Sequence, residues 1–178
     1  PYTLLLVFAV VFYFHKKWDF KTIMVFSFIA VASYFLEVAG VSTDKIFGSY
    51  VYGSGLGLKI AETPLIIGLN WLFLVYSSHS IVSIRLKNPF LKIITGAALM
   101  VLYDIIIEFV APEMKMWKFS GYYPPVQNFI SWFAAAVVFH TIVTFSGIKT
   151  NNKPARSLFI IQLSFFVILT IFITVFLK

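Results

Sequence analysis

The stretch FLKIITGAALMVLYDIIIEFV, residues 90–110, decides the fold class of this chain. It contains only three charged residues, and about 20 mostly apolar residues form a helix long enough to cross the hydrocarbon core of a bilayer. Two of these charges, Asp104 and Glu108, stand four residues apart and therefore share one face of the predicted helix. The stretch predicts a membrane-spanning helix with an acidic pair near one end.

Five further apolar runs accompany this one, separated by charged residues or by Gly and Pro. Apolar residues make up 60% of the 178 residues, charged residues only 12%, and the mean hydropathy is +0.92. Open sheets cannot cross lipid, and the runs lack the alternation of a β-barrel. We predict an all-α, polytopic membrane helix bundle of about six transmembrane helices in a single domain, residues 1–178, with spans at 1–14, 22–40, 62–84, 90–110, 125–145 and 158–177.

The first run is short and opens on Pro1 without an initiator Met, so we expect residues to precede it. The chain has no cysteine, which excludes disulfides, thiolate metal sites and a cysteine nucleophile. The net charge of +7 comes from basic residues in small groups between apolar runs, as in membrane-topology signals, so no nucleic-acid partner is expected.

The basic residues also predict an orientation. Nine of them lie in or beside the loops that follow the first, third and fifth runs, against five at the other side. By the positive-inside rule, the nine lie in the cytoplasm. We therefore expect a multi-pass protein of a bacterial inner membrane, with residues 41–61 and 111–124 outside.

These two outward loops are rich in Gly and aromatic residues, so we expect them to be structured caps. Each cap precedes a helix that begins near a proline, Pro64 or Pro125, which suits a first helical turn. An Asn and a Trp follow in both helices, and the two helix-loop-helix units form a weak internal repeat. The residues that mark its two copies are Asn70, Trp71, Asn128 and Trp132.

The acidic residues are the main candidates for chemistry. Three of the seven lie in loops, and the other four lie near the outward ends of predicted helices: Glu37, Glu62, Asp104 and Glu108. Any one of them could be a helix-end or interfacial charge. Four in one depth zone favour a functional site, because a like-charged pair such as Asp104 and Glu108 is unfavourable unless one is protonated or a cation intervenes.

For the other polar residues of the predicted helices, a purely structural role is an alternative to a functional one. Asn70 and Asn128 fit an interhelical hydrogen bond as well as a contact to substrate or water. We expect structural roles for His79 and His140, which lie away from the carboxylates. Trp71 and Trp132 lie about two turns inside their helices, too deep for an interfacial belt, and could line a pocket. Motifs for nucleotide-driven, zinc-protease or serine-hydrolase chemistry are missing.

The chain resembles the membrane carotenoid-biosynthesis proteins that include the CruF-type carotenoid 1′,2′-hydratases and bisanhydrobacterioruberin hydratase. The similarity covers most of the chain. Two departures are Phe109, where the family pattern has proline, and Tyr123-Pro124, in place of a Gly-Val pair, so the second cap is expected to fit a different end group. The residues that carry the resemblance are Glu37, the run 47–52 (FGSYVY), Leu56-Gly57, Pro64, Trp71, Asp104, Glu108, Trp117, Gly121-Tyr122, Pro125, Asn128-Phe129 and Trp132.

The resemblance implies addition of water to the terminal double bond of an acyclic carotenoid ψ-end, without cofactor or metal. A positioned acid would protonate the alkene, aromatic faces would stabilise the tertiary cation, and a carboxylate would take the proton from water. We assign Asp104 and Glu108 as proton donor and partner, with Glu37 and Glu62 as candidate water activators. The expected substrate-binding residues are Tyr50, Tyr52, Asn70, Trp71, Trp117, Tyr122, Asn128 and Trp132.

Three alternatives stay open. A carotenoid cyclase would begin with the same protonation and exclude water. A magnesium-dependent prenyltransferase could use Asp104 and Glu108 on the metal, with Lys115 and Lys118 near the diphosphate, but its second aspartate-rich motif is missing. A non-catalytic carotenoid-binding or transport protein would use the acids as coupling or structural groups.

Overall fold

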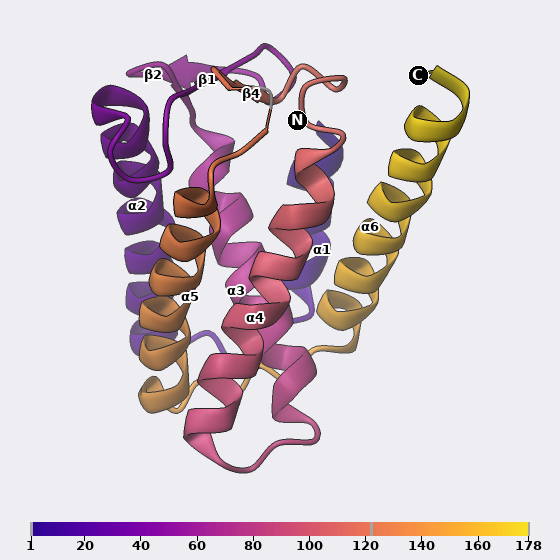
Figure 1. Ribbon diagram of the computed structural model, residues 1–178. Helices are drawn as coiled ribbons and strands as arrows, with labels where there is room; N and C mark the ends of the chain where they lie inside the picture. Colours follow the sequence, from indigo (N-terminus) through magenta and orange to yellow (C-terminus); the bar gives the residue numbers. More distant parts are fainter. Residues whose placement is uncertain (1, 122, 178) are drawn as a thin grey trace.

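The computed structural model describes residues 2–121 and 123–177, and in this part of the chain helices predominate (Figure 1). Five helices are long and apolar enough to cross a membrane, the last being continued by a π-helical turn. A sixth, α1, is shorter. The all-α membrane bundle is therefore confirmed. The helices are α1 (Tyr2–Tyr13), α2 (Phe20–Thr43), α3 (Ile66–Ser83), α4 (Pro89–Glu108), α5 (Val126–Ser146), α6 (Lys153–Phe172) and the turn η1 (Ile173–Leu177).

Capping side chains explain two of the boundaries. Asp19 accepts a hydrogen bond of 2.9 Å from the Thr22 amide, so α2 begins two residues earlier than predicted. Asn152 accepts one of 3.1 Å from the Ala155 amide, so α6 begins at Lys153 rather than at 158. Apolar content alone places the helix start at the first long apolar run and misses these polar first turns.

The predicted start of the third helix at residue 62 is wrong. Residues 59–64 instead form a tight hairpin of β2 (Lys59–Ile60) and β3 (Thr63–Pro64). Ala61 and Glu62 form its two-residue turn, with positive φ angles of 50° and 57°. Glu62 is therefore an exposed turn residue, and α3 starts one helical turn later, at Ile66.

The two caps form one structure. β1 (Tyr50–Tyr52) in the first cap pairs antiparallel with β4 (Trp117–Phe119) in the second, with Tyr50 opposite Phe119 and Tyr52 opposite Trp117. The Gly53 amide extends the contact by donating to the Met116 carbonyl at 2.9 Å. A Cβ at Gly53 would lie 2.2 Å from the Lys115 carbonyl oxygen, so only glycine allows this approach.

Helix α3 is the centre of the bundle, and 14 of its 18 residues are buried. A helix that is buried on all sides must be surrounded by protein, and here the other helices surround it (Figure 1). The outer helices expose large apolar side chains, as expected for surfaces that face lipid. Gly68 brings α3 against the backbone of α2, because a Cβ there would lie 2.2 Å from the Ala30 carbonyl oxygen.

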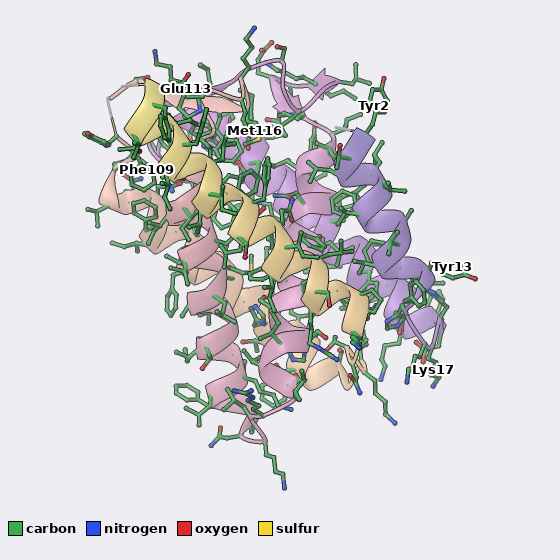
Figure 2. All side chains as sticks on the ribbon, turned by 90° about the vertical axis from the view of Figure 1, so that its right-hand side faces the viewer. Tyr2, Tyr13, Lys17, Phe109, Glu113 and Met116 are labelled. Carbon is green, nitrogen blue, oxygen red and sulfur yellow. The ribbon has the colours of Figure 1, made fainter. Side chains whose placement is uncertain are left out.

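The ends of the bundle differ in chemistry. In Figure 2, Glu113 and Met116 lie at the cap end and Lys17 lies at the opposite end. Near the Lys17 end, the two helix histidines form hydrogen bonds between elements: His79 to Thr150 at 2.8 Å and His140 to Ser78 at 3.1 Å. These contacts join α3 to α5 and to the loop before α6, away from the carboxylates.

Candidate active site

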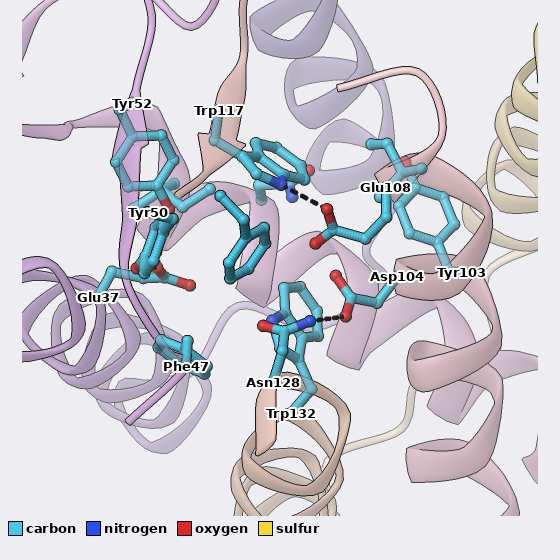
Figure 3. Close-up of a pocket in the computed structure, with 14 residues that line it drawn as sticks. Glu37, Phe47, Tyr50, Tyr52, Tyr103, Asp104, Glu108, Trp117, Asn128 and Trp132 are labelled. Carbon is cyan, nitrogen blue, oxygen red and sulfur yellow. Dashed lines mark hydrogen bonds between the residues drawn. The ribbon is translucent and has the colours of Figure 1, made fainter. Parts of the chain in front are cut away.

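Three of the four predicted carboxylates meet in one internal cavity at the cap end of the bundle. Glu37 comes from α2, and Asp104 and Glu108 come from successive turns of α4 (Figure 3). The cavity has a volume of about 20 Å³, enough for one water molecule. Glu62 does not reach it and is exposed in the hairpin turn. We call this space the carboxylate cavity; its other lining residues are Phe47, Tyr50, Tyr52, Ile67, Asn70, Tyr103, Ile107, Trp117, Phe119, Asn128 and Trp132.

Glu37 is held by three hydrogen-bond donors. Its Oε2 accepts from the hydroxyls of Tyr50 at 2.6 Å and Tyr52 at 2.7 Å, and its Oε1 accepts from Trp71 Nε1 at 2.9 Å. Alternate residues of a strand point to one face, which is why both tyrosines of β1 reach the same oxygen while Val51 points outward. Both oxygens of Glu37 thus act only as acceptors.

The two tyrosines remain donors over the whole physiological range. Burial, together with the charge of Glu37, raises the pKa of Tyr50 and that of Tyr52 well above the ordinary value for tyrosine. Their hydroxyls therefore keep their protons and fix the Glu37 side chain in place.

The pair on α4 has far fewer partners. Asp104 is fully buried, and its Oδ2 accepts a hydrogen bond of 2.8 Å from Asn128 Nδ2. Its Oδ1 is buried without a hydrogen-bond partner among the described residues. Glu108, one turn further along α4, accepts one bond of 3.0 Å from Trp117 Nε1. Both bonds are drawn in Figure 3.

Aromatic rings surround these groups. Trp71 and Trp132 are stacked with ring centroids 4.1 Å apart and planes inclined by 22°. The corresponding residues of the two predicted repeat units thus lie in contact, as do the paired strands β1 and β4. Among the candidate binding residues, Tyr122 lies outside the described residues, and Asn70 lines the cavity without a hydrogen bond to another described residue.

Five lining residues were not predicted as site residues: Phe47, Ile67, Tyr103, Ile107 and Phe119. Two of them have a signal in the sequence. Phe119 follows Trp117 by two residues in a short strand, so it points to the same face. Tyr103 stands four residues before Ile107 on the helix that carries the acidic pair. Phe47 enters from the cap loop and has no such regular spacing.

A larger pocket of about 520 Å³ adjoins the carboxylate cavity, and its size is typical of sites for small molecules. We call it the outer pocket. It shares Glu108 and Phe119 with the carboxylate cavity and is mainly apolar. Its remaining lining residues are Ile105, Phe109, Pro112, Glu113, Lys118, Gly121, Tyr123, Pro124 and Phe129.

Fold and site together define a multi-pass membrane protein with a buried cavity of carboxyl groups and aromatic rings. The chain belongs to a family described as carotenoid biosynthesis protein, whose sequence pattern matches residues 1–178. The resemblance drawn from the sequence motifs is thereby confirmed at the level of the family. No curated protein and no solved structure matches the chain.

Proposed function

We propose that this protein is a carotenoid hydratase that adds water to the terminal trisubstituted double bond of an acyclic ψ-end, without a cofactor. One observation carries the proposal: three carboxyl groups with different hydrogen-bond partners line a single water-sized cavity among aromatic rings. Hydration of an alkene needs a proton donor, a site for a cation and a proton acceptor for water. The cavity offers a group for each task.

The Asp104–Glu108 pair is the proton donor. Two negative charges one helical turn apart in a buried site are unfavourable, so the pair holds a proton between its two carboxyl groups. The buried Oδ1 of Asp104, without a partner, offers a position for that proton. The π electrons of the terminal double bond take the proton at the less substituted carbon, which leaves a tertiary cation on the other carbon.

Glu37 and the rings stabilise this cation. In this mechanism Glu37 acts as the anion, since an ionised carboxylate can accept all three of the hydrogen bonds that reach it. Aromatic faces of the cavity, among them Trp117 and Phe119, add attraction for a positive charge. A lone pair of water then forms the C–O bond, and the proton released from the water returns to the Asp104–Glu108 pair. The cycle closes with no net change in the protein.

The substrate end enters through the outer pocket. The carboxylate cavity holds about one water molecule, whereas the outer pocket is large enough for an isoprenoid end group and shares Glu108 with it. A carotenoid is about as long as the hydrocarbon core is thick, so a substrate that crosses the membrane brings its end to the carboxylates. By the positive-inside rule, the basic residues at the other end of the bundle favour an orientation with the caps outside the cytoplasm, and we place the protein in a bacterial inner membrane.

Expression in cells that make lycopene or γ-carotene, followed by mass analysis of the pigments, tests the proposal. A gain of one water supports the hydratase. An isomer of unchanged mass would instead identify a cyclase, and unchanged pigments would exclude both enzymes. Asp104→Asn and Glu108→Gln should remove the product while the protein still inserts. The matched control is Asp44→Asn, an exposed acid at the end of α2 whose left-handed backbone suits asparagine.

Magnesium chelation separates the hydratase from the prenyltransferase alternative. The proposed mechanism uses only the protein's own carboxyl groups, so treating the membranes with a chelator should leave the rate of water addition unchanged. Loss of activity that added magnesium restores would contradict the mechanism.

A further inference from the structure

A second small cavity lies on another side of the carboxylate cluster. It has a volume of about 30 Å³, enough for one or two water molecules, and residues of α1, α3, α4 and α6 line it. Only two of its lining residues are amides, Asn70 and Gln162, so we call it the amide cavity. The other lining residues are Leu4, Leu56, Ile66, Ile67, Tyr103, Ile107, Met116, Trp117 and Phe166.

The amide cavity adjoins the carboxylate cavity but not the outer pocket. It shares five lining residues with the former, including Asn70 and Tyr103, and none with the latter. Helix α4 separates the two sides: Tyr103 and Ile107 line the amide cavity, whereas Ile105 and Phe109 line the outer pocket. A substrate end in the outer pocket would therefore leave this second side of the carboxylate cavity open.

Three polar groups of the amide cavity lack protein partners. The Asn70 amide and the Tyr103 hydroxyl form no hydrogen bond to another described residue, and Oε1 of Gln162 is buried without a partner. All three lie in helices that cross the membrane, where an unsatisfied polar group is costly. A buried water needs two to four polar partners, and Asn70, Tyr103 and Gln162 supply them.

We propose that the amide cavity holds the water that is added to the carotenoid, with Asn70 passing it into the carboxylate cavity. The proposal rests on the hydratase function. The oxygen lone pair of this water forms the C–O bond with the tertiary cation, and the released proton goes to the Asp104–Glu108 pair. Asn70, Tyr103 and Gln162 are positioning residues for water and do not transfer the proton to the alkene.

The experiment uses membranes that contain the full chain, an acyclic carotenoid and D₂O. Two products are measured by mass: carotenoid that has gained water, and recovered carotenoid that carries deuterium. Deuterium in the recovered pigment counts protonations whose cation lost a proton again. A residue that delivers water affects the first quantity, and a residue that delivers the proton affects both.

Gln162→Leu and Asn70→Ala should each lower hydration about five- to tenfold, since each removes one hydrogen bond to the water. Deuterium incorporation should stay the same or rise, because a cation that is not captured by water returns to the alkene. The matched control is Ser77→Ala. Ser77 is, like Asn70, a polar residue of α3 whose side chain has no hydrogen-bond partner among the described residues, but it lines neither cavity. Its ratio of hydration to deuterium incorporation should equal that of the wild type.

An unchanged ratio in both variants would overturn the water-holding role. A parallel fall of hydration and deuterium incorporation would overturn it as well, because the residues would then act on protonation or on folding. Gln162→Met, which keeps a long unbranched side chain, replaces Gln162→Leu if that variant does not accumulate. Absence of both products in the wild type would refute the hydratase function itself.

Discussion

Glu37 and the Asp104–Glu108 pair line the same cavity, yet their hydrogen-bond partners differ sharply. Glu37 receives three donors on two oxygens, whereas the two carboxyl groups of the pair receive one donor each, and Asp104 keeps one oxygen without a partner among the described residues. Donors favour the ionised form of a carboxyl group, and their absence favours the form that keeps a proton. In the proposed mechanism, Glu37 of α2 is therefore the fixed anion and the pair on α4 carries the mobile proton.

The difference has its origin in the elements that meet at each group. A strand with tyrosines at alternate positions and a tryptophan of the central helix converge on Glu37. Among the described residues, the Asp104 side chain is hydrogen-bonded only to Asn128 in the first turn of α5, and the Glu108 side chain only to Trp117 in β4. Residues of one chemical type thus have different surroundings, on which the two roles of the proposed mechanism rest.

The largest expected effect is that of Asp104→Asn, which removes the proposed proton donor from the pair. The asparagine carbonyl can still accept the bond from Asn128, so the fold should persist. Water addition and deuterium incorporation should both fall about 10³-fold, the scale of a lost general acid. Pigment mass analysis in D₂O measures both. Retained deuterium incorporation would reassign the acid to another residue.

Glu37→Gln tests the other side of the comparison. The amide keeps the size of the side chain but removes the charge. Its NH₂ group is a donor and would face another donor, either the Trp71 N–H or a tyrosine hydroxyl, so a hydrogen bond is lost. We expect about a 10²-fold loss of hydration, together with a less stable protein, because a preorganised charge no longer faces the cation. The rate and the thermal unfolding midpoint in detergent measure the two effects. A variant with wild-type rate would remove Glu37 from the mechanism.

Tyr50→Phe and Tyr52→Phe make the surroundings of Glu37 more like those of Asp104. Each removes one donor from Oε2, so each should lower hydration about fivefold. Both donors reach the same atom, so the double variant should deviate from the product of the two single effects. The initial hydration rates of the three variants test this expectation. If the rate loss of the double variant equals the product of the two single losses, the two tyrosines do not act through a shared effect on Glu37.

Glu62→Gln should have the smallest effect, less than about twofold, because a substitution in an exposed turn is usually near neutral. The measurement is the same hydration assay. A loss comparable with that of Glu37→Gln would mean that the β2–β3 hairpin reaches the site in the active protein.

The lengths of the apolar runs and the positions of the basic residues predict most of this architecture. A helix must be apolar over about 20 residues to cross a bilayer, and basic residues gather in the loops on one side of it. The helix geometry of Asp104 and Glu108 also places them on one face without any structure. The start of a helix whose first turn is polar, such as α6 at Lys153, is harder to predict. Hydropathy alone does not identify the capping residue that begins the helix.

The cavity itself depends on contacts between distant segments, which no local pattern contains. The pairing of β1 with β4 brings Trp117 to Glu108, and the hairpin at 59–64 takes Glu62 away from the other acids. Phe47 enters from an irregular loop. The sequence predicts that Glu62 lies at the same depth in the membrane as the other carboxylates. In the structure, however, Glu62 lies in a two-residue turn, which keeps its side chain away from the cavity.

The β1–β4 pairing also sets the stage of synthesis at which the carboxylate cavity can be completed. β1 leaves the ribosome early, and its partner follows only after α3 and α4 have been made. Asn128, the donor to Asp104, comes later still, in α5. A nascent chain that has inserted only its first half therefore carries Glu37 and its tyrosines but no complete acid site. On the proposed function, proton delivery to a carotenoid therefore requires the chain to be inserted as far as α5.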